Sequence, residues 1–303
     1  MKSSKKWIIP AVILILSVAG LVITVRKSSF DLHEVRIDGI LFYTLILFAH
    51  YLISSLPTPI YIGDKRFFSS FLLHRLSLVS GYLFPLKIGL PMKVYFFKKY
   101  LDVPVNKTSA AIFFEASVHV VLITAGGILL GGTKYIFLDI RTVILLGLGG
   151  LVLFLLFWKY SARLTRFSWV RKIEDFLIKT KESFVESSRN KARVSLIFVL
   201  YIMMILLYIS RVGILLSAIN APLPFLQIAR AVLISSFITT LSMVPGGYAV
   251  REASLSFFLV QEGIALEATL IVAFLDRILS TGTSFLLGGM SSLIVMKRSL
   301  AEE

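Results

Sequence analysis

The sequence predicts an all-α integral membrane protein that passes through the bilayer several times. Apolar residues make up 57% of the 303 residues, the mean hydropathy is +0.86, and only 16% of the residues are charged. Soluble domains are typically about 45–50% apolar and about 25% charged. A soluble core could not enclose this much apolar surface, so we expect lipid to cover part of the chain.

Seven apolar stretches are candidate membrane helices, since a helix crosses the bilayer with about 20 predominantly apolar residues. They are residues 7–25, 39–56, 108–130, 142–158, 194–216, 231–244 and 278–296. We interpret the first stretch as a retained helix, because its apolar run is longer than the core of a signal peptide and no cleavage site follows it.

Two further apolar stretches are interrupted. Residues 67–86 contain His74 and Arg75, and residues 253–275 contain Glu262. Such segments can be re-entrant hairpins or discontinuous helices, and both need cover from protein or from a watery cavity at membrane depth. Together with the other stretches they predict about eight membrane-embedded helices, some of them broken or re-entrant.

Basic residues predict the orientation, because loops rich in Lys and Arg stay in the cytoplasm. Residues 159–193 hold ten Lys and Arg against four acidic residues, and residues 87–107 hold five Lys against one Asp. We expect both segments in the cytoplasm, the first with an amphipathic helix along the membrane surface. Lys2, Lys5 and Lys6 place the N-terminus there too, in a multi-pass protein of the cell membrane.

A spacing pattern relates two halves of what we expect to be one membrane domain, residues 1–303. Glu115 lies 30 residues after Pro85 (115 − 85), and Asp276 lies 31 residues after Pro245 (276 − 245). Broken helices at matching positions of two halves are typical of transporters. The alternative is a coincidence among residues that are common in membrane helices. The half-repeats would be residues 39–158 and 194–296, joined by the basic segment 159–193.

The composition excludes several classes of protein. There is no Cys, which excludes disulfides and thiolate metal sites, and four His make a His-rich metal site unexpected. The net charge is +15, but the basic residues flank apolar spans, so anionic lipid headgroups are the expected partner and nucleic acid is not. No Walker-type nucleotide motif occurs. We expect no cofactor, no metal and no enzymatic activity.

The strongest local motif runs from Pro245 to Glu252. Pro245, Gly246 and Gly247 end one helix and expose backbone groups, and Arg251 and Glu252 stand at the start of the next. A helix N-terminus favours the binding of an anionic headgroup. Charged side chains at membrane depth are costly, so we interpret them as a candidate functional site. The alternative is a cytoplasmic loop with an ordinary salt bridge.

The first half has a counterpart, in which Lys87 and Lys93 flank Gly89. These lysines could hold a lipid phosphate or extend to the membrane surface. Further along, Glu115 and His119 are four residues apart on one helix face. They could relay protons within the membrane, or form a neutral hydrogen-bonded pair that stabilises helix packing.

Glu252 needs a partner, because an unpaired carboxylate at membrane depth costs several kcal/mol. Its neighbour Arg251 points to another face of the helix, so we expect Arg277 or a lysine of the first half to pair with it.

Other polar residues receive simpler interpretations. We expect Arg211 to extend from its span to the membrane surface, and Phe42, Tyr43, Tyr201 and Tyr208 to be interfacial or lipid-facing.

These motifs resemble the lysylphosphatidylglycerol synthetase transmembrane (flippase-like) family. Its first-half pattern is Pro-x-x-x-Gly with basic residues, then Lys-x-x-x-Val-Pro before a helix that bears Glu or Arg. The matching positions here are Pro85 to Gly89, Lys93, Lys99 to Pro104, and Glu115. Its second-half pattern is Pro-Gly-Gly-x-Gly-x-x-Glu and a later Leu-x-Arg. The matching positions are Pro245 to Glu252, and Leu275, Asp276 and Arg277.

The chain departs from the family pattern at Ala249, where Gly is usual, and at Leu90 and Pro91, where an acidic turn is usual. Both departures weaken the transfer of residue roles but leave the architecture unchanged. The resemblance covers essentially the whole chain. It implies a standalone member without the aminoacyl-transferase domain, so only the lipid-translocating half carries over.

These observations lead us to expect a translocase for an anionic or phosphate-bearing lipid, or for a lipid-linked headgroup. The cations that would attract the phosphate are Lys87, Lys93, Arg251 and Arg277, and the carboxylates that would pair with them in the empty site are Glu115, Glu252 and Asp276. The alternative is a scaffold without transport activity that anchors a lipid-modifying enzyme, for which the intramembrane charges would be dispensable. An intramembrane enzyme is disfavoured because no nucleophile–base pair or metal-ligand set emerges.

Overall fold

The computed structural model describes residues 22, 35–83, 88–131, 168–242, 247 and 249–301. The described chain is almost entirely α-helical. Its helices are α2 (Ile37–Ser54), α3 (Pro57–Ile62), α4 (Phe67–Leu83), α5 (Gly89–Leu101), α6 (Val105–Gly131), α8 (Ser168–Ser188), α9 (Lys191–Ala218), α10 (Phe225–Leu241), α11 (Val250–Gln261) and α12 (Leu266–Ala301). The predicted helices 7–25 and 142–158 lie outside the described residues, except for Val22.

Four segments of the described chain are long and apolar enough to cross a membrane. They are Ile37–Ile62, Val105–Leu130, Lys191–Ala218 and Leu266–Val295. The first is built from α2 and α3, which are separate helices because Pro57 and Pro59 lack the N–H groups that would continue the ladder. The predicted class, a multi-pass helical membrane protein, is confirmed. The predicted number of about eight membrane-embedded helices stays a prediction.

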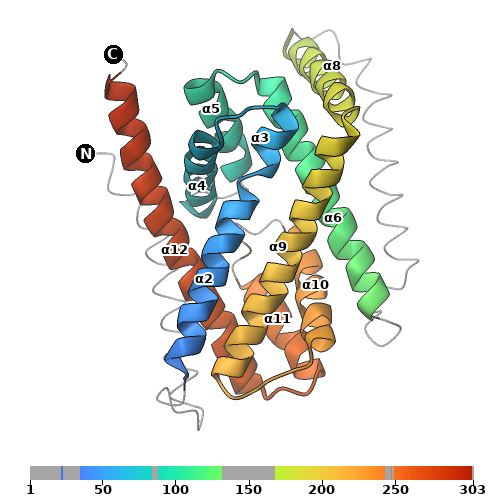
Figure 1. Cartoon of the computed structure of the whole chain (residues 1–303). Helices are drawn as coiled ribbons and strands as arrows, with labels where there is room; N and C mark the ends of the chain where they lie inside the picture. Colours follow the sequence, from blue (N-terminus) through green and yellow to red (C-terminus); the bar gives the residue numbers. More distant parts are fainter. Residues whose placement is uncertain are drawn as a thin grey trace.

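Two pairs of shorter helices form hairpins. In the first, α4 and α5 have 17 and 13 residues and pack against each other; in the second, α10 and α11 have 17 and 12 residues and do the same. All four are shorter than the roughly 20 residues that a full crossing needs. Figure 1 shows the first hairpin beside α3, at one end of the bundle, and the second hairpin at the opposite end. Each hairpin starts and finishes at the same end of the bundle, which is the form expected of a re-entrant segment.

The hairpins correct the predicted boundaries. His74 and Arg75 do not break a helix, because both lie inside α4, and the segment predicted as a basic loop at 87–107 contains α5. The second interruption falls at Gly263, whose φ of +99° ends α11 in a left-handed turn before α12 begins. The hairpin is thus α10 with α11, and it does not lie within residues 253–275.

The two halves of the described chain are built alike and exchange contacts. Each half has a long helix, a hairpin and a second long helix (Figure 1). The first long helices, α2 and α9, pack against each other. The first hairpin helix of each half packs on the last long helix of the other half, α4 on α12 and α10 on α6. The long helices of each half therefore hold the hairpin of the other half.

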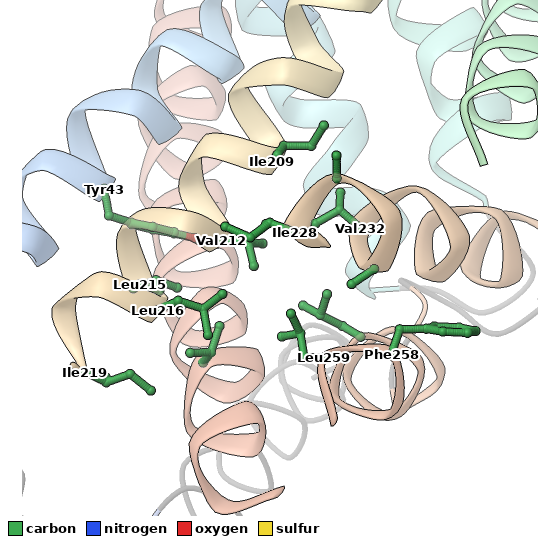
Figure 2. Packing of buried hydrophobic residues seen from close by; sticks show 14 of the residues in the cluster. Tyr43, Ile209, Val212, Leu215, Leu216, Ile219, Ile228, Val232, Phe258 and Leu259 are labelled. Atoms are coloured by element: carbon green, nitrogen blue, oxygen red, sulfur yellow. The ribbon is translucent and has the colours of Figure 1, made fainter. Parts of the chain in front are cut away.

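The main apolar core joins α2, α9, α10, α11 and α12. Figure 2 shows Val212 and Leu216 of α9 next to Tyr43 of α2, with Ile228 of α10 and Leu259 of α11 facing them. Tyr43, Val212, Leu216 and Leu259 are completely buried. Lipid tails are as apolar as these side chains, so dense van der Waals packing and the exclusion of gaps hold this core together.

Outward-facing side chains of the long helices are apolar, as lipid contact requires. Leu41 and Leu45 on α2 are 67% and 62% exposed, and Leu286 and Leu293 on α12 are 71% and 70% exposed. The amphipathic helix expected in residues 159–193 is α8. It packs against α6, where Asn106 donates a 2.7 Å hydrogen bond to the Ser183 hydroxyl.

Candidate functional site

The carboxylate of Asp276 joins four helices in the interior of the bundle. Asp276 lies on α12, and its side chain is 2% exposed. It accepts hydrogen bonds from Arg211 of α9 at 2.8 Å and from Arg251 of α11 at 2.5 Å. The hydroxyl of Tyr43 on α2 donates a third bond, at 2.6 Å. Charge-assisted bonds of this kind are roughly twice as strong as neutral ones, so a single carboxylate fixes the positions of three partner helices.

A second ion pair lies next to the first. The Glu252 carboxylate lies 3.0 Å from Nε of Arg277, and their side chains are 10% and 3% exposed. Consecutive residues of α11 therefore pair with consecutive residues of α12. The expectation that Glu252 has a remote partner, with Arg277 as a candidate, is confirmed. Glu252 also lies in the first turn of α11, where the helix dipole favours a negative charge.

The first half holds a corresponding cluster around Glu115 on α6. Its Oε2 lies 3.1 Å from Nζ of Lys93 on α5, and its Oε1 accepts a hydrogen bond from the Thr58 hydroxyl. The Tyr201 hydroxyl of α9 approaches Oε2 to 3.5 Å. Lys93 is 3% exposed, so it does not extend to the membrane surface.

The two clusters have the same plan. In each, the last long helix of a half supplies a carboxylate, Glu115 or Asp276, and the second helix of that half's hairpin supplies its cation, Lys93 or Arg251. In each, a tyrosine of the first long helix of the other half reaches the carboxylate. Every such cluster therefore ties one half of the described chain to the other.

Two cavities of about 320 Å³ each lie between the clusters. They are adjoining, because both are lined by His50, Ser54, His74, His119, Tyr208 and Ser236. The first extends to Glu115 and Tyr201, and the second to Arg211 and Arg251. This volume is at the lower end of the range for small-molecule sites, roughly 300–1,000 Å³.

Arg75 is a buried cation beside these cavities. The residue is 1% exposed, and its Nη2 donates a 2.7 Å hydrogen bond to the Ser54 hydroxyl, which lines both cavities. Its guanidinium lies 4.6 Å from the ring centre of Tyr51, a cation–π contact. Within the described residues no carboxylate lies at ion-pair distance from it, and its Nε and Nη1 have no hydrogen-bond partner. A charge so placed is costly unless an anion or water compensates it.

The structure describes eight of the predicted site residues. Lys93 and Glu115 meet in one cluster, and Arg251, Glu252, Asp276 and Arg277 meet in the other. Gly247 precedes α11 with a φ of +67°, and His119 lines both cavities with its ring 5.9 Å from that of Tyr201. Lys87, Pro245 and Gly246 lie outside the described residues. Glu115 directs its carboxylate to Lys93, Thr58 and Tyr201, so the expected proton relay to His119 has no direct geometric support.

The expectation that several residues face the membrane surface is wrong. Arg211 is 3% exposed and bonded to Asp276, Tyr43 is completely buried, and the Tyr208 hydroxyl accepts a 3.1 Å bond from Arg251. Phe42, at 54% exposed, does face outward. The available signal was an arginine within an apolar helix, which is costly unless paired. Hydropathy alone does not show which helix face turns inward.

Long apolar helices, two short helical hairpins and buried ion pairs beside polar cavities define a polytopic membrane protein with a polar site in its interior. Residues 2–288 match the family described as Lysylphosphatidylglycerol synthase TM region, and the chain belongs to this family. The family is a membrane region associated with lipid modification or transport. No match to the chain was found among the curated proteins or among the solved structures.

Proposed function

We propose that this protein moves a lipid with a phosphate-bearing, anionic headgroup across the bilayer, and that the headgroup passes through the two adjoining cavities. One observation carries the proposal, the charge balance of the helix interior. Among the described residues, five cations and three carboxylates lie in the two clusters and beside the cavities, a balance of +2 (5 − 3). A net positive charge away from water attracts an anion strongly. The residues are Arg75, Lys93, Arg211, Arg251 and Arg277, and Glu115, Glu252 and Asp276.

The ion pairs give the empty site a stable resting state. Lys93 and Arg251 are each held by a carboxylate, Glu115 or Asp276. A phosphate can accept the same charge-assisted hydrogen bonds, so it would compete with these carboxylates for the cations. After such an exchange Asp276 would keep Arg211 and Tyr43, and Glu115 would keep Thr58 and Tyr201, so neither carboxylate would lose all of its partners.

We also propose that the two halves are inverted repeats. Tyr43 and Tyr201 are as far apart in sequence as Lys93 and Arg251 (201 − 43 = 251 − 93 = 158), and each pair occupies matching places in the two clusters. Hairpins at opposite ends of the bundle support this reading (Figure 1). In transporters, inverted repeats provide two equivalent routes to one central site, one from each side of the membrane.

The basic segment 159–193 and the first lysines support a location in the cell membrane with the N-terminus in the cytoplasm. Anionic phospholipid would then be the principal partner on that side.

The test is lipid transport in phosphatidylcholine vesicles that contain the purified chain and fluorescent phosphatidylglycerol. We expect the protein to accelerate movement of this lipid between leaflets, and to act less on fluorescent phosphatidylcholine. K93Q and R251Q should each slow it about tenfold or more, since a charge-assisted hydrogen bond contributes about 1.5–3 kcal/mol. K98Q is the matched control, because Lys98 is on the same helix as Lys93 but its side chain is 52% exposed.

Equal rates in protein-containing and protein-free vesicles would overturn the transport proposal. Rates that K93Q and R251Q leave unchanged would show instead that the buried cations do not handle the headgroup. If wild-type protein in addition retained no anionic lipid through purification, as judged by mass spectrometry, the scaffold interpretation would replace it.

A further inference from the structure

Three of the four histidines in the chain line the same pair of cavities. His50 comes from α2, His74 from α4 and His119 from α6, so three separate helices bring them together. The Nδ1 atoms of His50 and His74 are buried without a hydrogen-bond partner. Histidine is the side chain whose charge ordinarily changes near neutral pH, so these three side chains are the candidates for proton uptake at the cavities.

The other charged groups around the cavities are engaged. Glu115 and Asp276 are each held by a cation and by a hydroxyl. Tyrosines ordinarily ionise only near pH 10 and arginines stay charged. The histidines are therefore the groups at the cavities best suited to change charge. The charged and titratable groups facing them are Tyr51, Tyr82, Lys93, Glu115, Tyr201, Tyr208, Arg211, Arg251 and Asp276, with Arg75 behind Ser54.

The arginines make proton uptake depend on an anion. In the empty cavity a protonated histidine would add a positive charge near Arg211 and Arg251, which like-charge repulsion disfavours. The negative charge of a phosphate in the cavity would offset the arginines and favour the protonated form of a histidine. By thermodynamic linkage, the bound anion raises the proton affinity of the histidines by the same factor by which the bound proton raises the affinity for the anion.

We propose that His50, His74 and His119 form a proton-binding site that is occupied together with the phosphate of the lipid, so that lipid and proton cross the membrane together. This rests on the proposed function. On the entrance side an O–H bond of a hydronium ion breaks as the proton forms an N–H bond with the lone pair of an imidazole nitrogen. On the exit side that N–H bond breaks and the proton returns to water. No other bond changes, and a monoanionic lipid with one proton crosses without net charge.

Calorimetric binding of short-chain phosphatidylglycerol to the purified full chain measures the linkage directly. Titrations at one pH, in two buffers of different ionisation enthalpy, report how many protons are taken up on binding. We expect uptake near neutral pH, and an affinity that rises up to about tenfold for each unit of decreasing pH. The phosphodiester stays ionised over this range, so the proton must go to the protein.

Glutamine variants of the three histidines test whether these side chains bind the proton. H50Q, H74Q and H119Q keep hydrogen-bonding capacity but cannot titrate. Each should reduce proton uptake, and the triple variant should bind lipid with no pH dependence. In vesicles with an internal pH dye, wild-type protein should acidify the lumen as fluorescent phosphatidylglycerol moves inward, and K98Q should behave as wild type.

Lipid that is bound and moved with no proton uptake by wild-type protein would overturn this inference and leave the proposed function standing. Lipid that is neither bound nor moved would overturn both. Should the triple variant fail to fold, the wild-type calorimetry and the single variants still decide, since proton uptake that all three single variants leave unchanged would also overturn it.

Discussion

The ion pair of Glu252 and Arg277 illustrates what a buried charge requires of its neighbours. Both side chains are at most 10% exposed and 3.0 Å apart. Removing one member leaves the other as an uncompensated charge, which costs about 3–5 kcal/mol, whereas removing both can be close to neutral. The pair is therefore best tested by changing its members separately and together.

We expect E252Q and R277Q each to lower the thermal stability of the purified protein markedly, and E252Q/R277Q to lose less than the sum of the two. The measurement is a double-mutant cycle of unfolding free energies. Strictly additive losses would show that the two side chains do not stabilise each other across α11 and α12.

Asp64, in the turn between α3 and α4, gives a pH-dependent contribution outside the membrane-spanning segments. Arg66 donates to its carboxylate from Nη2 at 2.7 Å and from the backbone N–H at 2.8 Å, and these bonds lower the pKa of Asp64. A lowered pKa in the folded state means that the stabilisation is present above the unfolded value of about 3.9 and is lost as the pH falls through the folded value.

D64N should therefore destabilise the protein at pH 7 and destabilise it less at pH 3. Arg66 is half exposed, so the contribution is about 0.2–1 kcal/mol after solvent screening. Chemical unfolding of both proteins at the two pH values measures it. A difference as large at pH 3 as at pH 7 would assign the effect to the shape of Asp64 and not to its charge.

At the scale of elements, the hairpins depend on close approach of their two helices. A Cβ added at Gly89, at the start of α5, would come within 2.8 Å of the Ser77 carbonyl oxygen and 3.0 Å of the Gly81 Cα in α4. These are backbone atoms, so the hairpin would have to open to accept a larger residue. Gly247 also lies close to α10, but there the nearest atom belongs to a side chain, Thr239 Cγ2, 2.6 Å from the added Cβ.

We expect G89A to destabilise the protein by about 1–3 kcal/mol, the usual cost of overpacking. G282A is the control, since nothing lies within 4 Å of the added Cβ at Gly282 in α12, and alanine is the better helix former. Thermal unfolding of the two variants should separate them clearly. Equal stability of G89A and wild type would mean that α4 and α5 are not packed this closely.

The hairpins also show which features of the fold could be predicted from the sequence and which could not. The interruptions near Pro85 and Glu262 were predictable, because turn residues and charges stand out in apolar surroundings. Helix α5 was not predictable, because its lysines at 93, 98 and 99 are typical of a basic loop. Lys93 turns inward to Glu115 while Lys98 is half exposed, and this difference arises only when α6 packs against one face of α5.

For the whole molecule, composition was sufficient to predict the class of protein, because no soluble fold can bury so many apolar residues. The carboxylates of the site, Glu115 and Asp276, were also predictable as charges in apolar helices. The tyrosines and Arg211 that complete the two clusters were not predictable. Tyr43 and Tyr201 come from the other half of the chain, and Arg211 comes from a different helix of the same half. Such partners depend on how α2 and α9 cross, and local sequence carries no signal for that.

The arrangement of the whole molecule predicts a labelling pattern for single cysteines, with no background because the chain has no Cys. Ser187 and Asn220 flank α9, a helix of 28 residues, so they should lie on opposite sides of the membrane. The basic segment 159–193 assigns Ser187 to the cytoplasm. A re-entrant first hairpin puts Lys65 and Asp102 on that same side, and a re-entrant second hairpin puts Ala265 with Asn220 (Figure 1).

We therefore expect a membrane-impermeant thiol reagent applied from the cytoplasmic side to label K65C, D102C and S187C, and the same reagent applied from outside to label N220C and A265C. Labelling of intact cells and of inverted membrane vesicles measures the two sides. The reverse pattern at all five positions would overturn the orientation but keep the fold. Labelling of K65C and D102C from different sides would overturn the fold, because α4 and α5 would then contain an odd number of crossings and could not form the hairpin that brings Lys93 to Glu115.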